Sequence, residues 1–179
     1  MDGMDVIVKK AKQGDDEAFT KLIDVNKVKL YKIAYMYVKN EQDALDILSD
    51  TICKSYKSIK KLKDPKFFNT WLFRILINTA TDKTKNNKKI IYIDDYEKIK
   101  SEFTDKMCES DFNIPANIDL YRAIDTLDIK YKNIVILKYF QDMTIAQISK
   151  ILNHPEGTIK VYLFRALKKL KIQLKEEYI

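Results

Sequence analysis

The sequence predicts an all-α fold of two small helical domains joined by an acidic linker, with a four-helix second domain that contains a helix-turn-helix. The 179 residues include only three glycines and three prolines, which leaves few places for turns. Apolar side chains recur at three- and four-residue spacings along most of the chain, as they do in amphipathic helices. Residues 94–117 lack this pattern and are rich in acidic side chains. We therefore expect helical domains at 1–93 and 118–179, on either side of this linker.

Three helices are expected in the first domain. The first starts at Asp15 or Asp16, where acidic side chains favour the positive end of a helix dipole, and runs to about Val38. The second follows the polar break at 40–43 and ends near residue 62. Its expected core-facing stripe is Ala44, Ile47, Leu48, Thr51, Ile52, Tyr56 and Ile59. The residue before Pro65 avoids the α region, so the third helix begins only at about residue 67, and it ends near residue 85.

The second domain begins near Ile118. We expect one buried helix to carry a set of side chains that pack beneath the helix-turn-helix, namely Leu127, Tyr131, Ile134, Val135, Leu137 and Lys138. Thr144 and Gln147 then have the spacing of a capping box at the start of a short amphipathic helix. Asn153 and His154 make a polar break, and Pro155 suits the first turn of the next helix.

The last helix is amphipathic and basic. Its expected apolar stripe is Ile159, Leu163, Ala166, Leu167 and Leu170, and the positive charges elsewhere around it are Lys160, Arg165, Lys168 and Lys171. A basic second helix after a tight turn is how many proteins set a helix into the DNA major groove. The alternative is an ordinary helical hairpin with a solvated lysine face, and we favour DNA reading.

The net charge of +7 is spread unevenly. Residues 1–93 hold 19 basic against 12 acidic side chains, residues 94–117 hold three against seven, and residues 118–179 hold eleven against seven. Basic modules at both ends favour a polyanionic partner. Most of the charge is lysine, which suits phosphate contact better than forked base recognition.

Composition also argues against several classes of protein. No apolar run is long enough to span a bilayer, and the first residues are too charged for a signal peptide. Cys53 and Cys108 do not have the spacing of a zinc site or a disulfide framework. We expect a cytoplasmic protein with neither metal nor cofactor. Catalysis has little support, because there is no glycine-rich phosphate loop and the single histidine, His154, lies in the turn.

Three carboxylates, Asp43, Asp46 and Asp50, share one face of the second helix by their spacing. They could bind a metal or act as an acid–base pair, although no histidine or further carboxylate is near in sequence. They could also form a solvated face. An intermediate interpretation, which we favour, is that they form a docking patch for a basic partner.

A lysine- and aromatic-rich segment covers residues 54–89. Six lysines lie from Lys54 to Lys66, and the later members of the set are Phe67, Phe68, Trp71, Phe73, Lys83, Lys85, Lys88 and Lys89. Lysines hold phosphates, and aromatic or asparagine side chains can receive exposed bases, so such a groove could hold an unpaired strand. We expect a functional role for Phe68 and Asn78, and a core position for Trp71.

Taken in order, these segments resemble the extracytoplasmic-function sigma factors, the small promoter-specificity subunits of bacterial RNA polymerase. DDEAFTKLIDVNKVKLYKIAYMYVKN at 15–40 looks like the family's opening helix, and DALDILSDTICKSYKSI at 43–59 like the helix that binds the polymerase clamp. FFNTWLFRILINTATDKTK at 67–85 resembles the promoter-melting segment. LDIKYKNIVILKYFQDMTIAQISKIL and EGTIKVYLFRALKKLK resemble the two halves of the C-terminal domain.

The resemblance implies roles for particular residues. Asp46, Ser49 and Asp50 match the face pressed against the polymerase clamp. Residues 63–68, including Lys63, Phe67 and Phe68, correspond to the loop that captures a flipped minus-ten base, with Asn78 beside it. Arg74, Lys83 and Lys85 would hold the surrounding phosphates. The minus-thirty-five contacts would come from Thr158, Lys160, Val161, Phe164, Arg165 and Lys168. The acidic linker is similar to the connector that threads the polymerase's positively charged channel.

The sequence also departs from the family pattern. A small polar residue followed by arginine often stands where this chain has Val161 and Tyr162. That removes a guanine-reading fork and offers apolar contact, for instance with a thymine methyl, so no promoter sequence can be carried over. Ala146, Gln147 and Ser149 replace the usual Glu-Glu-Ile-Ala pattern, but the capping argument still holds.

The resemblance therefore implies an alternative sigma factor that binds core RNA polymerase, directs it to specific promoters and promotes DNA opening, without being an enzyme. Family members are commonly held inactive by an anti-sigma factor, often membrane-bound. One rival is a transcription regulator that binds DNA by residues 118–179 and another protein by residues 1–93. A second rival is a metal-dependent nucleic-acid enzyme that uses Asp43, Asp46 and Asp50.

Overall fold

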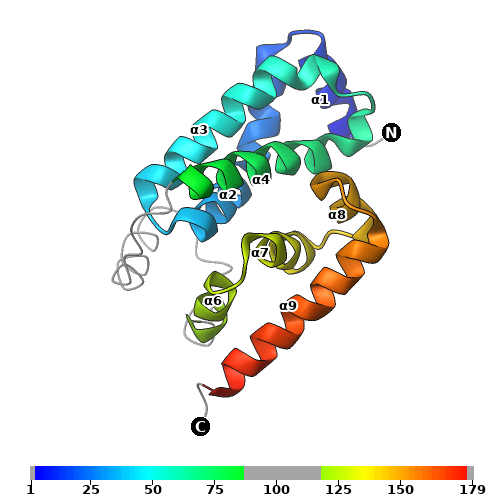
Figure 1. Ribbon diagram of the computed structural model, residues 1–179. Helices are drawn as coiled ribbons and strands as arrows, with labels where there is room; N and C mark the ends of the chain where they lie inside the picture. Colours follow the sequence, from blue (N-terminus) through cyan, green and yellow to red (C-terminus); the bar gives the residue numbers. More distant parts are fainter. Residues whose placement is uncertain (1–2, 87–117, 177–179) are drawn as a thin grey trace. The chain divides into compact units, whose positions relative to one another are not determined.

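The computed structural model describes residues 3–86 and 118–176, and every regular element within these stretches is a helix (Figure 1). The predicted all-α class is confirmed for this part of the chain, and the predicted linker at 94–117 lies outside it. The chain divides into two compact units, Met1–Asn86 with Ala146–His154 and Asn87–Ile145 with Pro155–Ile179. The predicted domain bounds stay a prediction.

Helix α1 (Gly3–Lys12) is an element that the sequence reasoning missed. Its buried face consists of Val8 and Ala11 alone, which is too short for a helical period to stand out. Gly14 follows with a φ of 100°, a backbone conformation that glycine adopts without steric cost. The turn leads directly into the first long helix.

Helices α2 (Asp16–Val38) and α3 (Glu41–Ser58) begin with side-chain caps. The carboxylate of Asp15 accepts a hydrogen bond from the Ala18 amide at 2.9 Å, and the Asn40 side chain accepts one from the Asp43 amide at 3.0 Å. Each cap satisfies a backbone donor that the first turn of a helix leaves free. Between the two helices, Lys39 takes a left-handed conformation with a φ of 56°.

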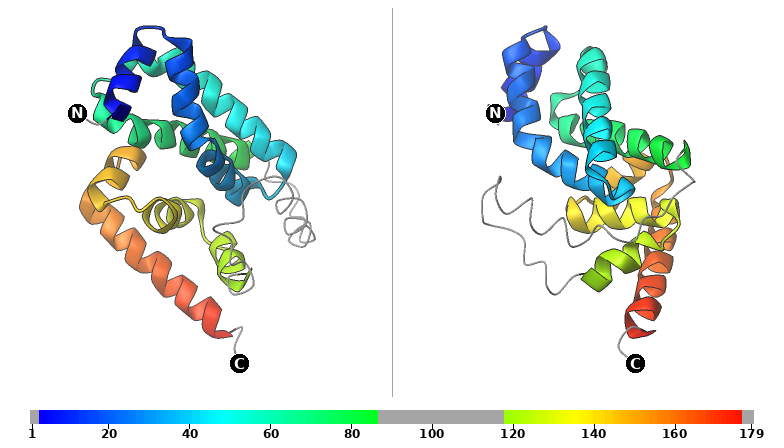
Figure 2. Two further views of the ribbon diagram at one scale, coloured as in Figure 1. Left: turned by 180° about the vertical axis from the view of Figure 1, so that it is seen from behind. Right: turned by 90° about the vertical axis from the view of Figure 1, so that its left-hand side faces the viewer.

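Two short 3-10 turns, η1 (Ile59–Lys61) and η2 (Pro65–Phe67), connect α3 to α4 (Phe68–Asn86). Helices α2, α3 and α4 pack against one another, as the views in Figure 2 also show. The largest fully buried side chains of this core are Leu22, Leu30, Ile33, Ile47, Phe68, Leu72, Leu76 and Ile77. Trp71, expected in the core, is half-buried.

Among the side chains of the predicted α3 stripe, Leu48 and Ile52 are half-buried and Tyr56 is exposed. Tyr56 is 51% exposed. Its ring packs edge-on against Phe19 at 5.1 Å between centroids, and its hydroxyl donates a hydrogen bond of 2.7 Å to Asp16. The phenol therefore covers the rim of the core while its polar end stays in water, as amphipathic aromatic side chains often do.

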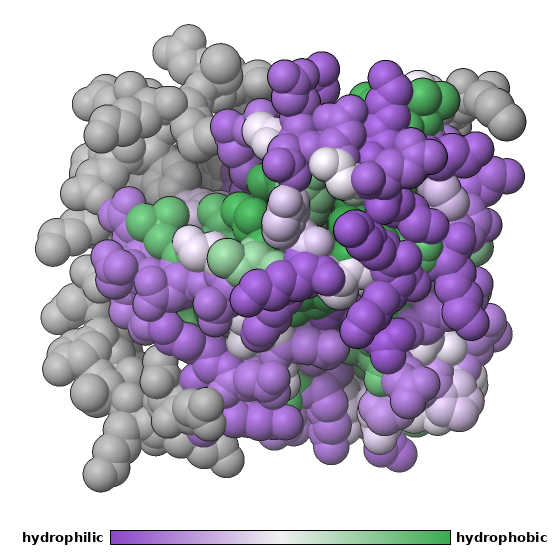
Figure 3. Space-filling model, turned by 90° about the horizontal axis from the view of Figure 1, so that it is seen from above, coloured by the Kyte–Doolittle hydropathy of each residue, from purple (hydrophilic) through white to green (hydrophobic). Residues whose placement is uncertain are grey.

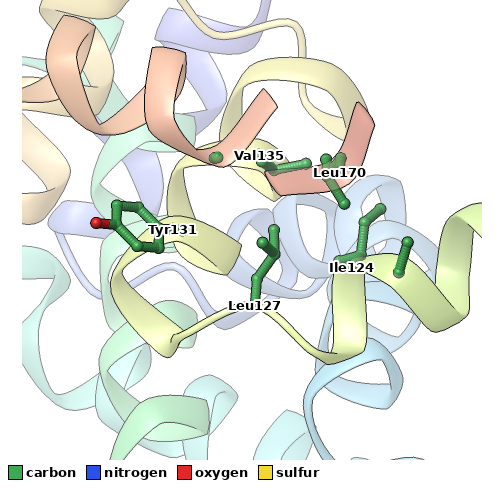
Figure 4. Packing of buried hydrophobic residues seen from close by; sticks show 7 residues of the cluster. Ile124, Leu127, Tyr131, Val135 and Leu170 are labelled. Carbon is green, nitrogen blue, oxygen red and sulfur yellow. The ribbon is translucent and has the colours of Figure 1, made fainter. Parts of the chain in front are cut away.

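The second unit has its own apolar core, formed between α6 (Ile118–Asp125), α7 (Ile129–Val135) and α9 (Glu156–Glu176). Figure 4 shows side chains from these segments converging, among them Ile124, Leu127, Tyr131, Val135 and Leu170. Leu127 is buried but lies in the turn before α7, so the prediction that it belongs to the same helix as Tyr131 is wrong. Helix α7 continues into the π-helical turn η3 (Ile136–Phe140).

Helix α8 (Ile145–Leu152) starts directly after Thr144, as the capping-box spacing predicts. Asn153 takes a left-handed conformation with a φ of 54° and ends it. Pro155 lies just before α9 rather than inside its first turn, because its carbonyl accepts the first helical hydrogen bond, from the Ile159 amide at 3.1 Å. On α9, Leu167 is 40% exposed and does not belong to the buried stripe.

Candidate protein and nucleic-acid interfaces

Helix α3 carries one buried and one exposed face. Ala44, Ile47 and Thr51 are buried at less than 1% exposure, and the Thr51 hydroxyl is satisfied by the carbonyl of Ile47 at 2.7 Å. The predicted docking residues Asp46, Ser49 and Asp50 all lie on the exposed side. Two apolar side chains, Leu45 at 41% and Tyr56 at 51% exposure, accompany them. The exposed face therefore combines negative charge with apolar contact area, which suits a protein partner.

Lys83 is the predicted DNA-binding residue whose surroundings differ most from the expectation. Its ammonium group lies 2.9 Å from Asp43 Oδ1 and 3.0 Å from Asp46 Oδ2. The hydrogen bonds to Asp43 and then to Asp46 raise the pKa of Lys83 above its usual value. A lysine held by two carboxylates is not available to a phosphate in this conformation, so we withdraw it from the candidate DNA surface.

The spacing along α4 explains this position. Lys83 follows Arg74 by nine residues, about two and a half turns of an α-helix, and therefore lies on the opposite side. That side faces α3, where Lys54 also reaches across and donates a hydrogen bond of 3.0 Å to the Thr79 hydroxyl. Neither cross-link was expected from the sequence. The helical phase of residue 83 relative to residue 74 is the signal that could have placed the first one.

Arg74, Asn78 and Lys85 form a polar stripe on the other side of α4. All three side chains are exposed, and their spacings of four and seven residues keep them on one line along the helix. The stripe offers a guanidinium, an amide and an ammonium group to the same partner. Phosphates and base edges are what such donors recognise.

The turn η2 places the two neighbouring phenylalanines differently. Phe67 is 44% exposed, whereas Phe68 is only 2% exposed and packs against Trp71 with 5.9 Å between ring centroids. The expectation that the Phe68 ring receives a base conflicts with this burial, because a base cannot stack on a ring inside the core. Phe67 and the exposed Lys63 remain as surface candidates at this turn. The carboxylate of Asp64 shapes the turn by accepting a hydrogen bond from the Lys66 amide at 3.0 Å.

Helix α9 separates a core face from an outward face. Ile159, Ala166 and Leu170 are at most 5% exposed. Predicted contact residues recur at three- and four-residue steps on the other side, where Val161 is 46% and Phe164 71% exposed and Arg165 and Lys168 are also exposed. Lys160 is exposed beside them and Thr158 is half-buried. The outward face thus mixes cationic and apolar groups.

The chain just before α9 is held by the side chain and the backbone of Ser149, in the last turn of α8. The Ser149 hydroxyl donates a hydrogen bond of 2.6 Å to the His154 carbonyl, and the His154 amide donates one of 3.2 Å to the Ser149 carbonyl. His154 therefore takes part in shaping a turn. These hydrogen bonds fit a structural role of His154 in the turn better than a catalytic role.

The described residues contain no group of three histidine, cysteine or acidic side chains that could hold a metal ion. Asp43 and Asp46, two of the three candidate ligands, instead share the ammonium of Lys83. The Lys83 ammonium therefore lies between two of the three candidate ligands. Within residues 3–86 and 118–176, none of the helices is both long and apolar enough to cross a membrane. The surface seen from above in Figure 3 is largely hydrophilic.

Comparison with protein families gives two matches in chain order. A model of sigma-70 region 2 matches residues 22–90, and a model of sigma-70 region 4 matches residues 118–170. The first covers most of α2 with α3 and α4. The second covers α6, α7 and α8 and most of α9, so by sequence α8 belongs with region 4.

Whole-length relatives agree with these matches. The chain is 37% identical over 168 residues to RNA polymerase sigma factor SigV of Bacillus subtilis (strain 168), covering 94% of this chain and 98% of the relative. It is 28% identical to ECF RNA polymerase sigma factor SigW of the same organism, with 94% and 95% covered. The identity to ECF RNA polymerase sigma-E factor of Escherichia coli (strain K12) is 25%, with 90% and 88% covered.

Two solved structures share the fold. CnrH in complex with the cytosolic domain of CnrY has a TM-score of 0.74 at 20% identity, with 98% of this chain and 99% of that chain covered. The sigma factor RpoE of Bartonella quintana, in complex with the anti-sigma factor NepR, has a TM-score of 0.65 at 21% identity, with 88% and 96% covered.

Proposed function

The chain belongs to the extracytoplasmic-function group of the sigma-70 family, and from this premise we propose how its surfaces divide the work of a sigma factor. Sigma factors of this group direct RNA polymerase to promoters and are not enzymes. The exposed face of α3, with Asp46, Ser49 and Asp50, binds the clamp of core RNA polymerase. Its negative charge suits a basic partner, and the exposed Leu45 adds apolar contact.

The outward side of α4 and the turn before it bind the minus-ten element. The observation that carries this proposal is the shared exposed line of Arg74, Asn78 and Lys85, with Phe67 exposed at the helix start. Arg74 and Lys85 hold the strand by its phosphates, whereas Asn78 and the Phe67 ring meet an unpaired base. Lys63 adds a further positive charge at the same turn. Stacking on Phe67 offsets part of the cost of extruding the base.

The outward face of α9 enters the major groove of the minus-thirty-five element. Arg165 is the side chain on this face that can form a forked contact with a guanine. Lys160, Lys168 and Thr158 lie within reach of phosphates on either side of the helix. Val161 and Phe164 supply apolar contact. The two promoter elements are thus read by two different units of one chain.

Transcription from a randomised template library tests the proposal. Purified core polymerase, with and without this protein, is given templates in which two short elements are random, and the transcripts are sequenced. We expect transcripts only with the protein, enriched for two elements at a fixed spacing. Duplex binding without any specific initiation would instead support the rival regulator. Metal-dependent cleavage of the template that is lost in Asp46→Ala would support the nuclease.

We further propose that the protein works in the cytoplasm and is held inactive there by an anti-sigma factor. The two solved relatives of the same fold are each bound to a partner, one of which is an anti-sigma factor by name and the other the cytosolic domain of a larger protein. A neighbouring reading frame for a single-span protein with a small cytosolic domain is the first candidate. Adding that domain to the reconstituted reaction should abolish specific transcription at a one-to-one ratio, and unchanged transcription would count against it.

A further inference from the structure

Two large apolar side chains on α9 are exposed to solvent and do not pack into the core. Phe164, at 71% exposure, is the most exposed large hydrophobic residue in the described part of the chain, and Val161 is 46% exposed. The opposite face of the helix is already filled by Ile159, Ala166 and Leu170. Packing within this unit therefore does not account for the exposed pair, and burial against a partner would stabilise it.

The charges around the pair indicate what kind of partner this is. Arg165 and Lys168 are exposed on the same side of α9, and Lys160 is exposed next to Val161. A cationic rim around an apolar centre suits an anionic partner that also carries apolar groups. In the DNA major groove the C5-methyl group of thymine is the apolar group on a base edge, and it distinguishes thymine from the other bases.

The spacing of the two side chains suits neighbouring base pairs. Val161 and Phe164 are three residues apart, a rise of about 4.5 Å along an α-helix. Successive base pairs are about 3.4 Å apart along the duplex. Where α9 runs along the groove, side chains with this offset can each meet a methyl group on adjacent or next-adjacent pairs.

We propose that Val161 and Phe164 form a thymine-reading patch, in which each side chain selects a thymine of the minus-thirty-five element by contact with its C5-methyl group. The inference rests on the proposed entry of α9 into that element. The patch specifies the base, the chemical group of that base that is read, and the two side chains that read this group. Arg165 then fixes the register of the helix through a neighbouring base or phosphate.

Deoxyuridine substitution tests the patch directly, because deoxyuridine lacks only the methyl group of thymidine. The minus-thirty-five element is first identified from the transcript library, and each of its thymines is then replaced singly in a duplex bound by the reconstituted holoenzyme. At two positions we expect affinity to fall about three- to five-fold, the size of effect expected for one buried methyl group. The other thymines should tolerate the change.

Side-chain truncation assigns each methyl to its reader. In Val161→Ala and in Phe164→Ala, thymidine and deoxyuridine should bind equally at one position each, while the other position keeps its preference. Val25→Ala is the matched control, because Val25 is 64% exposed on α2 and lies outside the proposed DNA surfaces. It should retain both preferences. Circular dichroism and retention of core polymerase confirm that each variant is folded.

The possible outcomes distinguish a failure of the thymine-reading patch from a failure of the proposed sigma function. Normal promoter-specific initiation with no deoxyuridine effect at any position overturns the thymine-reading patch and leaves the sigma function intact. Deoxyuridine effects that persist in both truncation variants also overturn it, because another group must then read the methyl. A holoenzyme with no preference for any minus-thirty-five sequence overturns the proposed role of α9 and the patch together.

Discussion

Lys83 Nζ lies 3.0 Å from Asp46 Oδ2, so a residue expected at the promoter is paired with a residue expected at the polymerase. The same ammonium also reaches Asp43 at 2.9 Å. The pair ties the end of α4 to the start of α3. Because the Asp46 side chain is 50% exposed, it can still meet a partner while it holds Lys83.

Lys83→Ala and Lys85→Ala should therefore behave differently. Lys85→Ala removes an exposed charge from the α4 stripe, so promoter affinity of the holoenzyme should fall and its salt dependence should weaken by about one counterion. Lys83→Ala should leave both unchanged, and it should lower the free energy of unfolding by no more than about 1 kcal/mol, since the pair is partly exposed. Binding measured across a salt series distinguishes the two. Equal salt slopes for both variants would restore Lys83 to the DNA surface.

Asp50→Lys should weaken the association with core polymerase. The substitution places a positive charge on the acidic docking face, where a basic partner would be repelled. Asp24→Lys is the matched control, because Asp24 is an exposed residue of α2 whose ion pair within the described residues is with nearby Lys27, at 3.0 Å. Fluorescence anisotropy with labelled protein gives both affinities. A polymerase affinity that is equal in the two variants would remove Asp50 from the docking face.

Arg165→Ala should weaken minus-thirty-five binding by about 1–3 kcal/mol, the range for a forked arginine–guanine contact, and should relax the sequence preference at one position. Polymerase association should not change. Arg122→Ala, on an exposed position of α6, is the control for the loss of one arginine charge. Holoenzyme binding to duplexes with each base at each position is the measurement. A uniform loss across all sequences would make Arg165 a phosphate contact instead.

Periodicity and capping chemistry carried most of the fold prediction, and they failed where the helical phase is interrupted. The start of α2 followed from Asp15, because a cap is a local hydrogen bond that a short sequence specifies. Phe67 and Phe68 could not be told apart, because η2 and α4 meet between them and the helical period does not extend across that junction.

Spacing within one helix predicted which site residues face outward, but it did not predict the contacts between helices. The outward positions of Val161 and Arg165 agree with a face opposite Leu170, which counting along α9 provides. The pairing of Lys83 with Asp46 joins residues 37 positions apart. The helical phase of residue 83 places it on the side of α4 opposite Arg74, but the identity of its partner depends on how α3 and α4 pack.

Alkaline pH should destabilise the first unit through Tyr37. Burial raises the pKa of Tyr37 above its ordinary value of 10.0. Above about pH 10 the unfolded chain therefore releases a proton that the folded chain retains, and the free energy of unfolding falls by up to about 1.4 kcal/mol per pH unit. The pKa of Lys83, raised by Asp43 and Asp46, acts in the same direction above 10.5. Stability should be constant with respect to these two groups at lower pH.

Tyr37→Phe should flatten this alkaline slope, because phenylalanine has no proton to lose. Urea unfolding at several pH values between 8 and 11.5 measures the slope, which is compared between variants so that any offset at neutral pH cancels. Tyr139→Phe is the control, since Tyr139 is 53% exposed. The same slope in Tyr37→Phe and in the unmodified chain would show that the phenol is not protected from ionisation.

Phe67→Ala and Phe68→Ala should separate promoter opening from folding. Phe68 is 2% exposed in the core, and truncating a buried phenylalanine costs about 3–5 kcal/mol of stability because it leaves a cavity. Phe67 is 44% exposed, so Phe67→Ala should fold normally. If its ring stacks on an unpaired base, the open complex should lose about 1–3 kcal/mol. Thermal unfolding reports the first effect, and permanganate reactivity of the minus-ten thymines reports the second. Normal opening in Phe67→Ala would mean that no base stacks on this ring, and the polar stripe of Arg74, Asn78 and Lys85 would then have to hold the melted strand without an aromatic partner at η2.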